Sequence, residues 1–136
     1  MITLCKREGE LKAGAMSEVR RLRPAYQILL LATAGGPDRV IVGDARTTFW
    51  EFKHGTPDFE SQGNQELCCR RLAAQGAYCR YVIWQENADG FGQRTMIVHP
   101  DMIARREGSR VVPETFCTGF NHAWLARQIL WAHRLH

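Results

Sequence analysis

With 136 residues, of which 45% are hydrophobic and 24% charged, the chain has the size and composition of one globular domain that needs no disulfide or metal to hold its core. No apolar run is long enough to cross a membrane, and the N-terminal MITLCKREGE is charged too early for a signal peptide, so we expect a cytoplasmic protein without a membrane partner. A formal net charge of +4 is compatible with partners that carry phosphate.

The first half of the chain predicts one helix followed by three strands. Residues 10–22 are polar and small, with a proline shortly afterwards, which is typical of a helix that ends there. The continuous apolar run at 26–33 predicts a strand covered on both faces. Two further runs, 38–43 and 47–53, flank a polar break and predict a hairpin.

The second half predicts a helix at 64–75, between an asparagine cap and a glycine, and then two antiparallel strands at 77–84 and 94–99. A short helical piece, an irregular segment and a helix from about residue 121 complete the chain. The apolar residues of this last helix are spaced as in a core or a dimer contact, rather than as a platform for nucleic acid.

These elements predict an α/β fold, with a mixed central sheet of about five strands and helices on both faces. The strands on either side of the 64–75 helix should be parallel, since a helix crosses from one to the other. We expect a single domain, 1–136, with a C-terminal helical extension over 101–136. The five cysteines have no paired spacing and predict reduced structural thiols.

The hairpin brings acidic and basic residues together. If its turn is centred between Asp44 and Ala45, opposed residues place Asp38 across from Glu51, with Cβ atoms about 4.5–5.5 Å apart. Lys53 lies two residues beyond Glu51 and therefore on the same face of the strand. Asp44 is then only a turn residue.

Two opposed carboxylates repel unless a cation lies between them, and Mg²⁺ is a hard cation that takes a few carboxylate oxygens and keeps several waters. A neighbouring lysine can orient a water and offset negative charge that develops in a transition state. The arrangement predicts phosphodiester hydrolysis. The alternative is an exposed carboxylate and lysine on an edge strand, without chemistry.

The order of motifs resembles the PD-(D/E)xK nuclease superfamily, and most closely its VRR-NUC branch. The resemblance is carried by GPD at 36–38, EFK at 51–53 and the following helix with Gln65, and it covers roughly residues 17–100. It implies a restriction-endonuclease-like core. It also implies Mg²⁺ or Mn²⁺ as the cofactor and DNA, branched or single-stranded, as the partner.

The resemblance also implies a role for each site residue. Asp38, Glu51 and the backbone carbonyl of Phe52 would bind the metal, and Lys53 would position the attacking water. Gln65 would be an accessory polar residue, although a glutamine at this place can equally well satisfy a nearby backbone group.

The family often adds a glutamate from its first helix to the metal. Glu18 is the best match, and Glu8 or Glu10 could serve instead. His54 follows Lys53 directly, but strand alternation puts it on the opposite face, so we do not expect it to be catalytic.

We therefore predict a divalent-metal-dependent nuclease acting on DNA. A homodimer is compatible with so small a chain, which has little surface to wrap a duplex alone. The alternative functions are a non-catalytic nucleic-acid-binding module or a protein-interaction module on the same fold.

Overall fold

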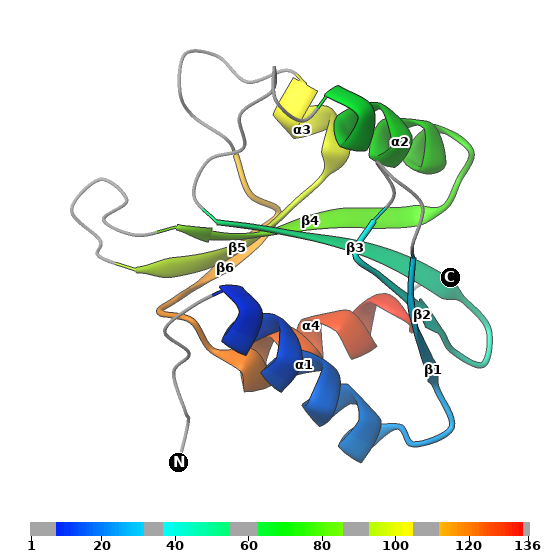
Figure 1. Cartoon of the computed structure of the whole chain (residues 1–136), viewed down its shortest axis with the longest axis vertical. Helices are drawn as coiled ribbons and strands as arrows, with labels where there is room; N and C mark the ends of the chain where they lie inside the picture. The colour runs from blue at the N-terminus through cyan, green and yellow to red at the C-terminus, as the bar shows by residue number, and fades with distance from the viewer. Residues whose placement is uncertain (1–7, 32–36, 55–62, 86–92, 105–111, 135–136) are drawn as a thin grey trace.

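The computed structural model describes residues 8–31, 37–54, 63–85, 93–104 and 112–134. These residues form one sheet and four helices (Figure 1). The strands are β1 (Gln27–Leu30), β2 (Arg39–Val42), β3 (Thr47–His54), β4 (Tyr78–Gln85), β5 (Arg94–Val98) and β6 (Thr115–Thr118). The helices are α1 (Glu8–Leu22), α2 (Gly63–Ala74), α3 (Pro100–Ala104) and α4 (His122–Ala132).

The sheet has six strands in the order β1-β2-β3-β4-β5-β6. Every neighbouring pair is antiparallel except β3 and β4, which are parallel and are joined through α2. A parallel pair needs a crossover of this kind, because its two strands start at the same end of the sheet. The predicted α/β fold with a mixed sheet is therefore confirmed.

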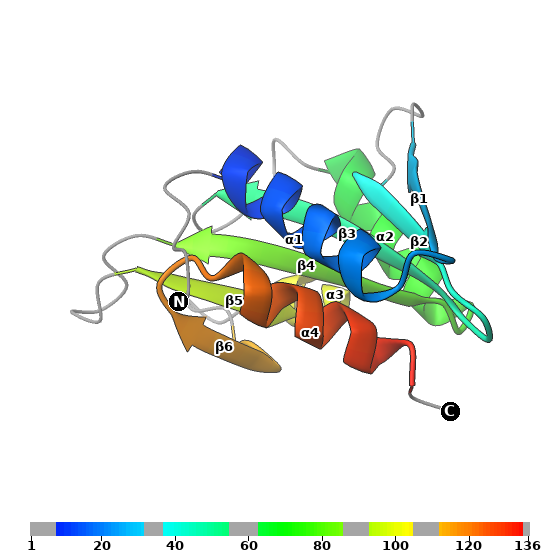
Figure 2. The same cartoon turned by 90° about the horizontal axis from the view of Figure 1, so that it is seen from below.

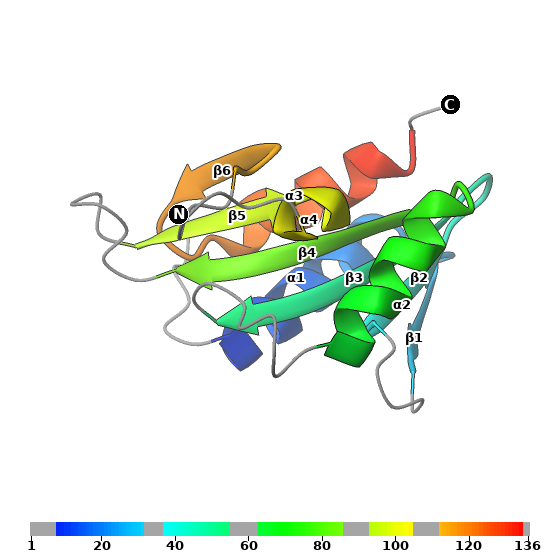
Figure 3. The ribbon, with the colours of Figure 1, turned by 90° about the horizontal axis from the view of Figure 1, so that it is seen from above.

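Helices cover both faces of the sheet. Figure 2 shows α1 and α4 side by side on one face, and Figure 3 shows α2 and α3 on the other. The first face packs on α1 and α4 through a large apolar cluster that includes Trp50, Phe52 and Ile129. The second face packs on α2 through a smaller cluster that includes Cys69 and Ile83. Residues that alternate along β3 thus face different helices.

The prediction for the first strand was wrong in its burial. The run at 26–33 was expected to be covered on both faces, but β1 lies at the edge of the sheet and pairs only with β2. Leu29 is 47% exposed and Leu30 is 72% exposed. An unbroken apolar run is typical of a central strand, but the position of a strand in the sheet depends on the pairing of the whole chain, and here the run is used at the margin.

The C-terminal part is more closely integrated than the expected extension. The segment predicted to be irregular contains β6, which pairs with β5 and gives the sheet its sixth strand. Helix α4 contributes Leu125, Ile129 and other buried residues to the larger cluster, as its apolar spacing predicted. Trp131, by contrast, is 56% exposed. None of the helices in the described ranges has the length and apolar character that a membrane crossing requires.

The β2–β3 turn packs directly against the end of α4. Nε2 of the buried His133 lies 2.8 Å from Oγ1 of Thr48, and the same oxygen accepts a 2.8 Å hydrogen bond from Nε1 of Trp50. The His133 ring also contacts the Tyr26 ring in a tilted arrangement, at 5.1 Å between ring centres. A Cβ atom on Gly43 would lie 2.5 Å from Nδ1 of His133. The histidine therefore requires a glycine at this turn.

Gly43→Ala is expected to lower the free energy of unfolding by about 1–3 kcal/mol, because His133 is held on two sides and cannot move aside freely. Urea titration of the variant measures this loss. Gly9→Ala is the matched control, since no atom of the described residues lies within 4 Å of its added Cβ and alanine favours the helix. Equal unfolding midpoints for the two variants would contradict the proposed fit.

Candidate metal centre

The hairpin has the predicted register. Val42 pairs with Thr47, and Arg39 pairs with Trp50. The next pair in this register is Asp38 with Glu51, although Asp38 itself lies just before the first residue of β2. The structure therefore brings the two carboxylates together, as the sequence predicted.

Asp38 takes over a hydrogen bond that a backbone carbonyl would normally accept. Pro37 occupies the position across from Phe52, and the backbone N–H of Phe52 donates instead to Oδ2 of Asp38, at 2.8 Å. At a hydrogen-bonded position of an antiparallel pair, the N–H and the C=O of a residue both point to the residue opposite it on the neighbouring strand. Proline has no N–H, so Pro37 cannot donate to the carbonyl of Phe52. The ladder geometry therefore leaves the carbonyl oxygen of Phe52 without a donor from Pro37, on the same side of β3 as the N–H that Asp38 accepts.

Glu51 is a buried carboxyl group. It is 1% exposed, and its Oε2 atom has no hydrogen-bond partner among the described residues. Burial, together with a hydrogen bond and like charge from Asp38, raises the pKa of Glu51 to about 9, against the opposing effect of the Lys53 charge. Burial and a neighbouring carboxylate both disfavour the ionised form, so the Glu51 carboxyl is stabilised either by a proton or by a bound cation.

Lys53 lies on the same face of β3 as Glu51, and its charge acts on Glu51. In the parallel pair, Glu51 is next to Tyr81 and Lys53 is next to Ile83. Cys69 of α2 packs on this face and is fully buried. Asp38, Glu51 and Lys53 thus form one cluster under α2, at the end of β3.

Lys12 of α1 is a member of this cluster that the sequence did not indicate. Its Nζ atom lies 3.7 Å from Oδ2 of Asp38 and 5.6 Å from the centre of the Phe52 ring. Asp38 lies beyond the end of its strand, which lets a residue from the opposite helical layer reach it. No motif marks Lys12, because the rotation of α1 about its axis depends on packing that only the folded chain specifies.

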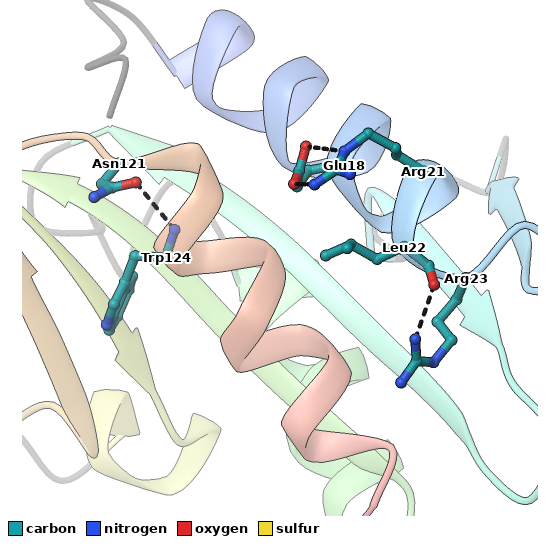
Figure 4. A network of polar contacts seen from close by, with 6 residues as sticks. All are labelled: Glu18, Arg21, Leu22, Arg23, Asn121 and Trp124. Atoms are coloured by element: carbon teal, nitrogen blue, oxygen red, sulfur yellow. Dashed lines mark hydrogen bonds and ion pairs between the residues drawn. The ribbon is translucent and has the colours of Figure 1, made fainter. Parts of the chain in front are cut away.

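Glu18 is not brought to the cluster. It accepts a 3.1 Å hydrogen bond from Nε of Arg21, and Figure 4 shows the pair on the side of α1 that looks toward α4. The hydrogen bond from Arg21 lowers the pKa of Glu18, and the positive charge of Arg127 on α4 acts in the same direction. Glu18 follows Lys12 by six residues, about 9 Å along the helix axis. Its predicted role as a metal ligand has no support in this arrangement.

The other first-helix candidates differ in position. Glu8 is the first residue of α1 and precedes Lys12 by one helical turn, so positions 8 and 12 share a side of the helix. Its side chain lies outside the described part of the structure. Glu10 is exposed. Of the three glutamates, Glu8 is therefore the one whose position shares the side of α1 from which Lys12 contacts Asp38.

Helix α2 has the predicted orientation. Cys69 and Leu72 pack on the sheet, as their spacing predicted. Gln65 lies in the first turn of α2, but its side chain is outside the described part of the structure, so its role stays a prediction. His54 stacks on Trp84 at 4.7 Å between ring centres, on the opposite face from Lys53, as predicted.

The residues present fit a hard divalent cation. Two carboxylates and the carbonyl of Phe52 offer oxygen ligands, and Oε2 of Glu51 is a buried acceptor that has no hydrogen-bond partner in the described part of the chain. Within the described ranges, no group of three or more histidine, cysteine, aspartate or glutamate side chains is arranged around one point. A magnesium ion, which keeps several waters, does not need such a group. Cys68, Cys69, Cys79 and Cys117 are free thiols.

Comparisons with known proteins add no relative to this description. No family model matches the chain, and a search of curated proteins finds no similar sequence. The resemblance to the PD-(D/E)xK nucleases therefore depends on the short motifs and on the cluster that they form.

Lys12→Met is expected to increase the affinity for Mg²⁺ several-fold, because it removes a positive charge next to one of the two carboxylates. The stability of the metal-free protein should change by less than about 1 kcal/mol, since the ion pair is partly exposed to water. Thermal unfolding at increasing Mg²⁺ concentrations measures both quantities. A weaker affinity for Mg²⁺ in the variant would show that Lys12 supports the site rather than competing with the metal.

Proposed function

We propose that the chain is a divalent-metal-dependent nuclease that hydrolyses phosphodiester bonds of DNA. The observation that carries the proposal is the opposition of Asp38 and Glu51 across the hairpin, with Lys53 on the same face and a buried acceptor oxygen on Glu51. The candidate cofactor is Mg²⁺ or Mn²⁺. A cytoplasmic location and a homodimer stay predictions beside this proposal.

The proposed roles follow from the chemistry of each group. Asp38, Glu51 and the carbonyl of Phe52 hold the cation, which supplies positive charge to the phosphate and acidifies water when bound. Lys53 donates a hydrogen bond to the attacking water and so fixes its direction. As the water oxygen bonds to phosphorus, the water releases a proton to the solvent, the bond from phosphorus to the leaving sugar oxygen breaks, and that oxygen takes up a proton from the solvent. The ammonium group of Lys53 offsets the negative charge that develops.

Helix α2 would exclude bulk water from one side of this reaction. It covers the face of β3 that carries Glu51 and Lys53, and its buried Cys69 packs on that face. Electrostatic interactions are stronger in such a sheltered site than in water. Gln65, in the first turn of this helix, is proposed as an accessory polar residue.

The experiment that tests this function is a cleavage panel. Labelled single strands, blunt duplexes, nicked duplexes and branched junctions of DNA, with one RNA strand for comparison, are incubated with the protein in Mg²⁺, in Mn²⁺ and in EDTA. Cleavage of at least one DNA that depends on the metal is the expected result. Absence of cleavage from the whole panel would overturn the proposal.

One observation favours a second candidate, a nucleic-acid-binding module without catalysis. Lys12 already lies beside Asp38, and the raised pKa of Glu51, about 9, keeps that carboxyl protonated at neutral pH. The pair is therefore neutralised without a metal. Salt-dependent DNA binding that is the same in Mg²⁺ and EDTA, without cleavage, would identify this alternative.

A further inference from the structure

A second surface of interest lies on the other side of the sheet from the metal centre, at the C-terminal half of α4. Two hollows adjoin there, with volumes of about 580 Å³ and 260 Å³. Arg127 and Trp131 line both of them. These two residues are one helical turn apart and form a ridge between the hollows.

The two hollows reach different elements. The larger one extends from the ridge to Tyr78 of β4 and Thr115 of β6. The smaller one extends to Arg23, which follows α1. Figure 2 shows α1 and β6 on either side of α4, so the two hollows together run across this helix. We call this surface the α4 groove.

The α4 groove combines positive charge with an exposed aromatic ring. Arg23, Arg127 and Arg134 contribute guanidinium groups, and Trp131 is 56% exposed. Among the described residues that line the groove, Glu114 is the one carboxylate, and it is ion-paired with Arg80. Glu18, near the same end of α1, is bonded to Arg21 (Figure 4). The acidic groups are therefore paired, while the arginines of the groove favour an anionic ligand.

We infer that the α4 groove binds a short stretch of single-stranded nucleic acid. Guanidinium groups recognise phosphate through directed hydrogen bonds, and an exposed indole ring offers a surface on which a base can stack. In a duplex, the faces of the bases are covered by their neighbours, so Trp131 can reach only an unpaired base. The groove is separate from the metal centre, so binding requires neither metal nor catalysis.

The test uses Lys53→Ala protein in EDTA, which prevents cleavage, and a fluorescein-labelled oligothymidylate as the probe. Fluorescence anisotropy measures its affinity. In this background, Trp131→Ala is expected to weaken binding about tenfold, whereas Trp131→Phe retains most of the affinity because it keeps an aromatic face. Trp131 is exposed, so neither substitution should unfold the protein, and thermal unfolding checks this.

The arginines are tested through the salt dependence of binding. Replacing both Arg127 and Arg134 with glutamine should lower the slope of log affinity against log salt by about 1.4, the value expected for two lost phosphate contacts on a single strand. Arg20→Gln, compared with each single arginine variant of the groove, removes one charge from an exposed position of α1 and should change affinity less than twofold.

Three results would overturn the inference. They are unchanged affinity in Trp131→Ala, a loss in Arg20→Gln equal to that in the groove variants, and equal competition by a blunt duplex. Cleavage does not enter this measurement, so the nuclease proposal can fail while the groove binds. Conversely, metal-dependent cleavage together with no effect of the groove variants would overturn only the groove.

Discussion

Replacing Lys53 with alanine is expected to lower the rate of DNA cleavage about a thousandfold or more while the protein stays folded. The size of the effect reflects two lost contributions, the orientation of the attacking water and the stabilisation of developing charge, each of which is worth about a hundredfold or more in enzymes of known mechanism. The measurement is a single-turnover rate at saturating Mn²⁺. Circular dichroism and thermal unfolding establish that the variant is folded.

Lys12→Ala is the matched control for this experiment. It also removes an ammonium group from the cluster, but one that contacts Asp38 from the α1 side rather than sharing the face of Glu51. We expect it to retain cleavage within about tenfold, since the ion pair between Lys12 and Asp38 is partly exposed to water and such pairs contribute about 1 kcal/mol or less. If Lys53→Ala retains full activity, or if Lys12→Ala is equally inactive, Lys53 is not the residue that positions the water.

Glu51→Gln is expected to stabilise the metal-free protein at pH 8 by roughly 5 kcal/mol. The pKa of Glu51 is about 9 in the folded protein, compared with an ordinary value near 4.5, because the carboxyl is buried and next to Asp38. Between these two pH values the unfolded chain releases the proton and the folded chain keeps it. The stability of the native chain therefore falls as pH rises from about 4.5 to 9.

The amide of glutamine does not titrate, so in the variant residue 51 does not contribute to the change of the free energy of unfolding with pH. At pH 5 the two proteins should have nearly the same free energy of unfolding, and the difference should grow with pH. Chemical denaturation at several pH values in EDTA measures it. Asp44→Asn, in the exposed turn of the same hairpin, serves as the control and should follow the native protein. If the free energies of unfolding of the native and Glu51→Gln proteins changed in parallel with pH, Glu51 would not be a buried carboxyl group with a raised pKa.

The same variant separates stability from metal binding. A cation that binds only the folded state adds about 2.7 kcal/mol at a hundred times its dissociation constant. Addition of Mg²⁺ should therefore stabilise the native protein and have little effect on Glu51→Gln. The variant is thus expected to be more stable than the native protein without metal and inactive with it, which a purely structural glutamate would not explain.

The hairpin could be predicted from sequence because its geometry is local. A turn between Asp44 and Ala45 fixes every pair in the two strands, and two-residue alternation then fixes their faces, so Asp38, Glu51 and Lys53 follow from counting. The helices were placed within a few residues by their caps and spacing. These features depend on neighbours in the chain.

The features that could not be predicted depend on contacts between distant segments. Lys12 reaches Asp38 only because α1 packs across β3, and the exposure of Leu30 follows from the place of β1 at the edge of the sheet. The short strand β6 does not alternate polar and apolar residues, since two threonines flank Phe116 and Cys117. Its partner, β5, determines its conformation.

The order of strands in the sheet has a consequence for how the protein folds. Each strand lies next to its neighbour in the chain, so the sheet can grow by adding one strand at a time, and folding should be fast for a protein with this much sheet. Asp38 and the residues opposite it meet by closing a short loop, which costs little chain entropy. The acidic pair is therefore built from neighbours in the chain, and the helix that covers it is the next element along the sequence.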